Sequence, residues 1–186
     1  MINFSSSALA LTATLGLATL TGCSAAVTPA PTTPVASASS TANTTSTSSL
    51  KANLTYLIEE EKLAFDVYTA LNELWGAKAF GNILQSEASH QSQVLSIMTA
   101  YGVADPRSAE AGVFVDPELQ KLYDSLMAQG TQSLTEAYKV GVLIEETDIA
   151  DLQKMLAENP PADVATMMNS LLSGSQNHLA AFSKKL

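Results

Sequence analysis

The chain has 186 residues and a formal net charge of −9, from 9 basic and 18 acidic side chains. This acidic balance argues against a nucleic-acid-binding protein, which requires a basic surface, and it is compatible with a site for cations. The first fifty residues contain no Asp, Glu, Lys or Arg, so all of the charge lies in the rest of the chain. That remainder has the length of one domain and can bury a core of its own.

Residues 1–22 have the pattern of a signal peptide. The apolar run from Ala8 to Leu20 is too short to span a bilayer and is typical of the apolar core of such a peptide, although no Lys or Arg precedes it. The end of this segment, Leu20-Thr21-Gly22-Cys23, resembles the lipobox of bacterial lipoproteins. The resemblance implies cleavage before Cys23 and lipidation of Cys23. The alternative is an ordinary secreted chain with an incidental cysteine.

A lipidated Cys23 would anchor the chain to membrane lipid. The expected location is therefore a bacterial cell envelope, facing the periplasm or the exterior. Ser24, which follows the cysteine, favours the outer membrane where one exists. Cys23 is also the only cysteine, which excludes an intrachain disulfide.

Residues 23–49 follow as a segment of almost only Ser, Thr, Ala and Pro. Such a composition buries too little apolar surface to offset the entropy of ordering, so we expect a disordered, flexible tether. The tether would carry a single domain over residues 50–186.

From Leu50 onward the apolar residues recur with the period of an α-helix, and strand patterns are absent from the sequence. Turn and capping signals divide this part into one short helix over 116–130 and four long ones over 50–75, 80–101, 133–158 and 162–184. The link between the second and third long helices is long and contains the short helix. The predicted fold is all-α, a four-helix bundle with one long crossover, which is the connectivity of ferritin-like bundles.

Each long helix carries a side chain able to bind metal in its apolar stripe. Glu87 and His90 are three residues apart on the second helix and share a face, so they can present an oxygen and a nitrogen to one point. Glu61, Glu145 and His178 occupy the stripes of the other three. Several buried carboxylates need a positive partner, and no Lys or Arg lies in these stripes. A pair of metal ions would resolve this conflict, and iron, manganese or zinc suits such ligands best.

Simpler interpretations remain for each of these residues. A run of three glutamates at 59–61 favours a solvated face, so Glu59 would face water, and Glu60 is open to the same interpretation. Likewise only one of Glu145 and Glu146 would be buried. His178 alone would be an ordinary core histidine. Glu60, Glu146 and Asp148 are therefore secondary candidates for metal binding.

Five motifs resemble the DUF2202 family, which has no known function and belongs to the ferritin-like superfamily. They span residues 59–68, 86–90, 112–123, 140–152 and 174–182. One position departs from the family, since Phe65 stands where Arg or His usually precedes the Asp-Val-Tyr sequence.

The wider resemblance is to rubrerythrin-like di-iron proteins, which carry Glu-x-x-Ala-x-x-x-Tyr on one helix and Glu-x-x-His on two others. It implies that Glu61 and His90 bind one metal, that Glu145 or Glu146 and His178 bind the other, and that Glu87 bridges them. The last helix departs from this pattern, because Ser175 stands in place of Glu. Asp148 or the second Glu of a pair could fill the gap, or the site could hold one metal.

The function implied is that of a di-iron protein with redox activity toward oxygen, peroxide or ferrous iron, of ferroxidase or peroxidase type. The alternatives are a protein that sequesters or senses metal without turnover, and a structural bundle that binds other proteins. Whether the chain forms an oligomer stays open. No Gly-rich phosphate loop, cysteine pair or Ser-His-Asp spacing supports nucleotide, thiol or serine-hydrolase chemistry.

Overall fold

The computed structural model describes residues 39–186, and the side chains from residue 47 onward. The predicted signal peptide, the lipidation site Cys23 and the tether up to residue 38 lie outside this part. The described chain forms five α-helices without strands, as the apolar periodicity predicts, and none of these helices is long and apolar enough to cross a membrane. The helices are α1 (Ser39–Trp75), α2 (Lys78–Ala100), α3 (Pro117–Gly130), α4 (Leu134–Ala157) and α5 (Ala162–Ser183).

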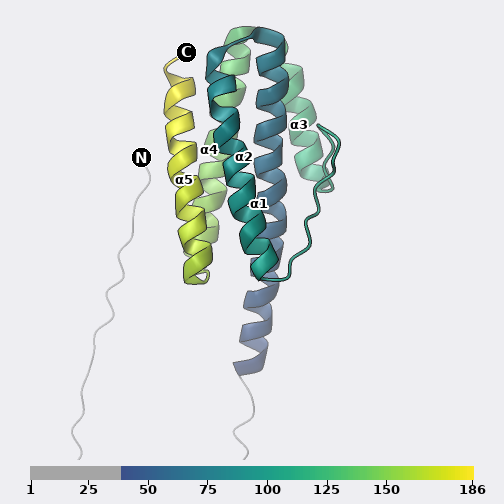
Figure 1. Cartoon of the computed structure of the whole chain (residues 1–186), viewed down its shortest axis with the longest axis vertical. Coiled ribbons are helices and arrows are strands. Elements are labelled where there is room, and N and C mark those ends of the chain that lie inside the picture. The colour runs from purple at the N-terminus through teal and green to yellow at the C-terminus, as the bar shows by residue number, and fades with distance from the viewer. Residues whose placement is uncertain (1–38) are drawn as a thin grey trace, which may run out of the picture. The chain divides into compact units, whose positions relative to one another are not determined.

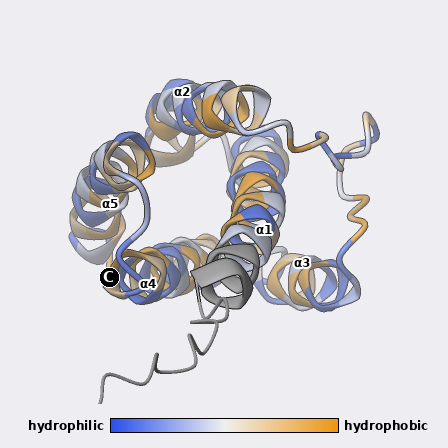
Figure 2. Ribbon diagram, turned by 90° about the horizontal axis from the view of Figure 1, so that it is seen from below, coloured by the Kyte–Doolittle hydropathy of each residue, from blue (hydrophilic) through white to orange (hydrophobic). Residues whose placement is uncertain are grey.

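Two antiparallel helix hairpins, α1–α2 and α4–α5, stand side by side to form a four-helix bundle (Figure 1). The link from α2 to α4 runs back along the bundle, so α4 starts at the end where α2 starts. Side-chain contacts identify both ends: Trp75 Nε1 donates to the Gly130 carbonyl at one end, and Tyr101 donates to Asp163 at the other. Seen along the bundle, α3 lies outside the ring of long helices, against α1 and α4 (Figure 2).

The first helix begins earlier than the sequence pattern predicts. α1 starts at Ser39 and not at Leu50, so residues 39–49, which we placed in the flexible tether, are helical. The physical reason is that neither Gly nor Pro occurs between Pro34 and Leu50. Once a helix is nucleated by a packed segment, each further residue adds a hydrogen bond at little cost, even for poor helix formers such as Ser and Thr.

Local signals set the other boundaries. Gly76 ends α1 and Gly102 follows α2, both with positive φ, the conformation that glycine adopts without strain. The Asp116 carboxylate caps α3 by accepting from two backbone N–H groups of its first turn. The Ser133 hydroxyl caps α4 by accepting from Glu136 N, which is one half of a capping box. The Glu136 carboxylate bonds Gln129 and Lys139.

The apolar core is divided into two clusters, one towards each end of the bundle. The first is rich in aromatic rings and includes Tyr68, Phe80 and Phe182. The second, nearer the start of α5, is aliphatic and contains Met167 and Met168. Between the clusters, each of the long helices carries at least one buried polar side chain that faces the middle of the bundle.

Candidate metal centre

The five primary candidates meet at mid-height in the bundle. Glu61 comes from α1, Glu87 and His90 from α2, Glu145 from α4 and His178 from α5, and each is at least nine-tenths buried. Helical geometry explains the convergence, because Glu87 and His90 lie one turn apart on the same face of α2. The two apolar clusters above and below hold the four helices in register around these side chains.

The side chains form two triads that share one carboxylate. Glu61, Glu87 and His90 make up the first triad, and Glu87, Glu145 and His178 make up the second. His90 Nδ1 lies 3.2 Å from Glu61 Oε2 and 3.5 Å from Glu87 Oε2. His178 Nδ1 lies 2.8 Å from Glu87 Oε1 and 3.5 Å from Glu145 Oε1. The two oxygens of Glu87 therefore face different histidines.

Several of these atoms have no hydrogen-bond partner although they are buried. Among the described residues, such orphaned atoms include Glu61 Oε1, Asp148 Oδ1, Glu87 Oε1 and His178 Nδ1. The last two are 2.8 Å apart, yet their angles do not meet the geometry of a hydrogen bond. Orphaned buried polar groups are rare and costly, so a cluster of them indicates a missing positive partner.

The spacing fits a metal ion as that partner. Two ligand atoms that each lie about 2.1 Å from one metal are separated by about 3.0–3.4 Å when the angle between them is octahedral or tetrahedral. The nitrogen–oxygen separations within the triads run from 2.8 to 3.5 Å. Each triad can thus hold one ion with small side-chain movements.

Hydrogen bonds from outside the triads hold two of the carboxylates. The Tyr68 hydroxyl donates to Glu145 Oε1 over 2.6 Å. Ser175, one turn before His178 on α5, donates its hydroxyl to Asp148 Oδ2 and leaves Asp148 Oδ1 unpaired. A bond of this kind fixes the orientation of a carboxylate before metal binds. Asp148 thus lies beside the position where the Ser175 hydroxyl replaces the expected Glu.

The imidazole of His90 is held in a tight space. It stacks on the His178 ring with centroids 5.6 Å apart. On another side it lies against the backbone of Gly174, where an added Cβ would be 2.4 Å from Nε2. Ser86 Oγ lies 3.5 Å from the same nitrogen. Nδ1 is therefore the nitrogen that His90 presents to the carboxylates.

The charges of the centre conflict when no cation is bound. Burial, together with the neighbouring carboxylates, raises the pKa of Glu61 well above its ordinary value, and burial raises the pKa of Glu145 to about 7 and of Asp148 to about 6. Burial alone would lower the pKa of His178, but the facing carboxylates Glu145 and Glu87 outweigh it and raise this pKa to about 9. The contacts with both histidines lower the pKa of Glu87 despite its burial. A metal ion held by these groups would therefore displace protons from them.

The secondary candidates for metal binding differ in burial, and none of them belongs to a triad. Glu146 is exposed, so Glu145 is the buried member of that pair. Asp148 is buried beside Ser175 but belongs to neither triad. Glu60 is buried without a hydrogen-bond partner for either oxygen, and it also lies outside the triads. The prediction that Glu59 faces water is wrong, and so is the same alternative for Glu60, since both are at least 96 % buried.

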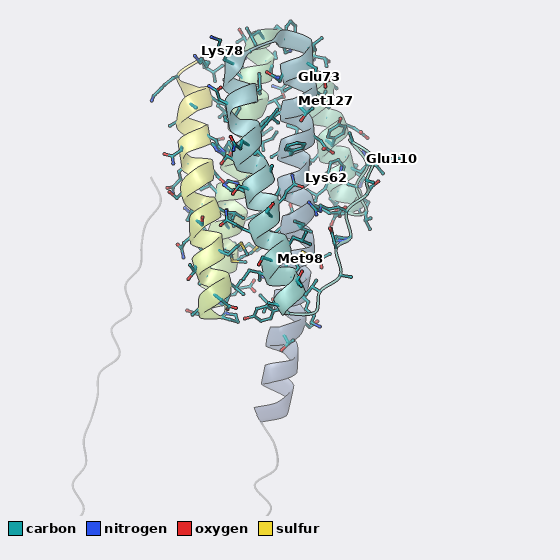
Figure 3. All side chains as sticks on the ribbon, viewed as in Figure 1. Lys62, Glu73, Lys78, Met98, Glu110 and Met127 are labelled. Atoms are coloured by element: carbon teal, nitrogen blue, oxygen red, sulfur yellow. The ribbon has the colours of Figure 1, made fainter. Side chains whose placement is uncertain are left out.

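Glu59 is buried because the crossover covers it. Its two oxygens accept from Val115 N and Asp116 N, at 2.7 and 2.9 Å, just before α3. Two further residues of the same α1 face continue this attachment: Lys62 donates to the Glu110 carbonyl and Asp66 accepts from Gly112 N. Figure 3 labels Lys62 on α1 and Glu110 on the crossover beside it. Their spacing, at 59, 62 and 66, is the signal that α1 has a second covered face.

The chain shares its fold with a solved relative. A crystal structure of the hypothetical protein MJ0754 from Methanococcus jannaschii matches with a TM-score of 0.73 and 34% sequence identity, over 86% of this chain and 85% of that one. The curated sequence, the uncharacterised protein MJ0754 of Methanocaldococcus jannaschii, is 39% identical over 137 residues. That alignment covers 73% of this chain and 74% of the relative. Neither name states an activity.

The relative changes one expectation. It comes from an archaeon, and archaea lack a bacterial outer membrane. The predicted location in a bacterial cell envelope, which depends on the lipobox-like sequence at Cys23, is contradicted by this finding. The predicted location depended on the short sequence Leu20-Thr21-Gly22-Cys23, which lies outside the residues that the structure describes.

Family membership is clear from the extent of the match. The family model described as "Uncharacterized protein domain (DUF2202)" matches residues 51–186, which include all five motifs that the sequence shares with this family and every residue of the two triads. The chain therefore belongs to the DUF2202 family of uncharacterised domains.

Proposed function

We propose that this protein is a ferritin-like metal-binding bundle whose centre holds two metal ions, most suitably iron, with manganese or zinc as alternatives. Glu61 and His90 would bind one ion, Glu145 and His178 the other, and Glu87 would bridge them. The order of the helices supports the ferritin-like assignment, because two hairpins joined by one lengthwise crossover is the arrangement that builds such centres from facing helices.

One observation carries this proposal. The two oxygens of Glu87 face the Nδ1 atoms of two different histidines, at 3.5 Å from His90 and 2.8 Å from His178. A carboxylate that served one histidine as a simple ion-pair partner would not need both oxygens in this arrangement. Division of the oxygens between two nitrogen ligands is the geometry of a bridging carboxylate.

The residues around the triads prepare the ligands. Tyr68 holds Glu145 in place, and Asp148, bonded by Ser175, adds a fourth carboxylate beside the three of the triads. The apolar clusters on both sides exclude bulk water, which strengthens every charge interaction in the centre. A bound pair of redox-active ions would supply electron transfer to an oxidant such as oxygen or peroxide, or accept electrons from ferrous iron.

A second candidate function is metal sequestration without turnover. Ser175 favours it, because replacement of the expected carboxylate on α5 leaves only a hydroxyl, which is already bonded to Asp148. Oxygen consumption distinguishes the two functions. A redox centre consumes oxygen when ferrous iron is added to the protein, whereas a sequestering protein binds the iron without such consumption.

Metal content tests the proposal directly. The purified chain should bind two ions, measured by elemental analysis after desalting. Glu87→Gln should lose most of both, because it removes the shared ligand, and His178→Ala should lose mainly one. Glu146→Gln is the matched control, since it changes an exposed glutamate beside Glu145. Full metal content in Glu87→Gln would exclude the bridging role.

A further inference from the structure

Glu60 is a buried carboxylate that neither the triads nor the crossover uses. Only 4 % of the residue is exposed, and neither of its oxygens has a hydrogen-bond partner. Both neighbours are accounted for, since Glu59 binds the crossover and Glu61 belongs to a triad. A buried carboxylate without a hydrogen-bond partner is costly unless it binds a ligand or a proton. Its position in the bundle indicates which kind of ligand that is.

The pairing of α1 with α4 locates Glu60. The helices run antiparallel, and the side-chain contacts between them follow this direction: Asn53 with Glu158, Tyr56 with Asp151, and Tyr68 with Glu145. Glu60 lies one turn beyond Tyr56, so it falls opposite the turn of α4 that follows Asp151 towards the centre. A small pocket places Glu60 beside this part of α4 and beside α3, and its lining is otherwise mostly apolar: Leu63, Leu122, Leu126, Leu143, Ile144 and Thr147.

The same register places a line of carboxylates between the protein surface and the centre. In order from the surface they are Glu158, Asp151, Glu60, Asp148 and Glu61. Glu158 is exposed, Asp151 is half-buried and the other three are buried.

The outer end of this line is open. A cavity of about 310 Å³ lies there, lined by Asn53, Tyr56, Asp151, Lys154, Met155 and Glu158. Its two carboxylates outnumber the single ammonium of Lys154, which is itself exposed. Oxygen atoms of this kind are the ligands that hard divalent cations accept on the way to a binding site.

We propose that Glu60 is a relay site for a divalent metal cation, which enters at the cavity beside Asp151 and passes through Glu60 and Asp148 to the triads. This inference rests on the proposed metal centre and adds the path by which that centre is filled. The relay needs no bond to break, since the cation exchanges water and carboxylate oxygens at each step.

The rate of metal uptake tests this relay separately from the metal capacity of the centre. Metal-free protein is mixed with Co²⁺ in a stopped-flow instrument, the absorbance of the bound ion is followed, and the final content is measured after desalting. Glu60→Gln should slow uptake by about tenfold or more while the final content stays at the wild-type value. Asp151→Asn, a change at a half-buried position, should slow uptake in the same way. Glu146→Gln should leave the rate unchanged.

Three other results of the uptake experiment would contradict the relay. Uptake rates within twofold of the wild type in both Glu60→Gln and Asp151→Asn would overturn the relay. A lower final content in Glu60→Gln would also overturn it, because Glu60 would then be a permanent ligand. If the wild-type chain takes up no Co²⁺ at all, the proposed metal centre itself fails, and the relay fails with it.

Discussion

The absence of a side chain at Gly174 decides whether His90 can stand in the centre. A Cβ at this position would lie 2.4 Å from His90 Nε2 and 2.6 Å from Cε1. The ring cannot move away freely, because it stacks on His178 and faces Glu61 on its other nitrogen. Gly174 lies inside α5 with ordinary helical backbone, so the requirement for glycine is steric and does not come from backbone conformation.

Gly174→Ala should therefore destabilise the protein, although a change from glycine to alanine inside a helix usually stabilises it. In an unobstructed helix the change stabilises by up to about 1 kcal/mol. Here the clash should destabilise by about 1–3 kcal/mol and lower the metal content, because His90 is displaced from the first triad. Chemical denaturation and elemental analysis measure the two effects. Gly81→Ala is the control, since its nearest contact would be the Asn72 side chain at 3.1 Å. Equal stability of the two variants would exclude the steric role of Gly174.

At the scale of the element, α1 is covered on two faces. One face carries Glu61 and Tyr68 towards the centre, while the opposite face binds the crossover through Glu59, Lys62 and Asp66. The pairing of Lys62 with Asp66 and the placement of the Lys62 ammonium 4.6 Å above the Phe114 ring add to this attachment. The charged residues of this α1 face thus bind the backbone of a neighbouring segment.

Glu59→Gln tests this attachment. The amide keeps the shape of the side chain but offers one acceptor oxygen to two backbone N–H groups, so Val115 N or Asp116 N loses a charged partner. The expected loss is about 1.5–3 kcal/mol of unfolding free energy, without a change in metal content. Glu118→Gln, in an exposed pair with Lys121, should stay within about 0.5 kcal/mol. A loss of metal in Glu59→Gln would show that the two faces of α1 are coupled.

The sequence predicts the helices and the triads for reasons that are local. Apolar period, caps such as Asp116 and the Glu87–His90 spacing all act within a few residues, and the structure agrees with them. The surroundings of Glu59 and Glu60 are not local, because they depend on where the crossover and α3 pack. A run of three glutamates looks the same in either case, so the prediction of a solvated face is wrong. The early start of α1 was missed since Ser and Thr residues carry no apolar pattern.

At the scale of the whole molecule, the centre joins the two hairpins. The α1–α2 hairpin supplies Glu61, Glu87 and His90, and the α4–α5 hairpin supplies Glu145 and His178. Neither hairpin contains both histidines, so a complete centre exists only when they pack together. In a chain with a net charge of −9, bound cations would also offset repulsion among the buried carboxylates that come from both halves.

The metal-free protein should lose stability as the pH rises. Asp148, Glu145 and His178 have folded-state pKa values raised to about 6, 7 and 9 from the ordinary values 3.8, 4.5 and 6.5. A raised pKa contributes stability that is complete below the unfolded value and is lost as pH rises through the folded value. Thermal unfolding of the metal-free chain should therefore shift down by several degrees between pH 5 and 9.

Bound metal should reverse this trend, because cations compete with protons for the same atoms and bind better as the pH rises. The comparison requires melting curves of metal-free and metal-loaded protein across the same pH range. Parallel curves for the two forms would mean that the triads do not hold the metal.

Trp75 is an intrinsic fluorescence probe of this protein. It is the only tryptophan, and its indole N–H bonds the Gly130 carbonyl at the end of the bundle where α1, α3 and α4 meet. The cavity beside Asp151 lies towards the opposite end, where Asn53 contacts Glu158. Indole fluorescence therefore follows the undocking of α3 from α1, while the signals of a bound ion follow the middle of the bundle. Two transitions that separate during unfolding would reveal that this domain opens from one end.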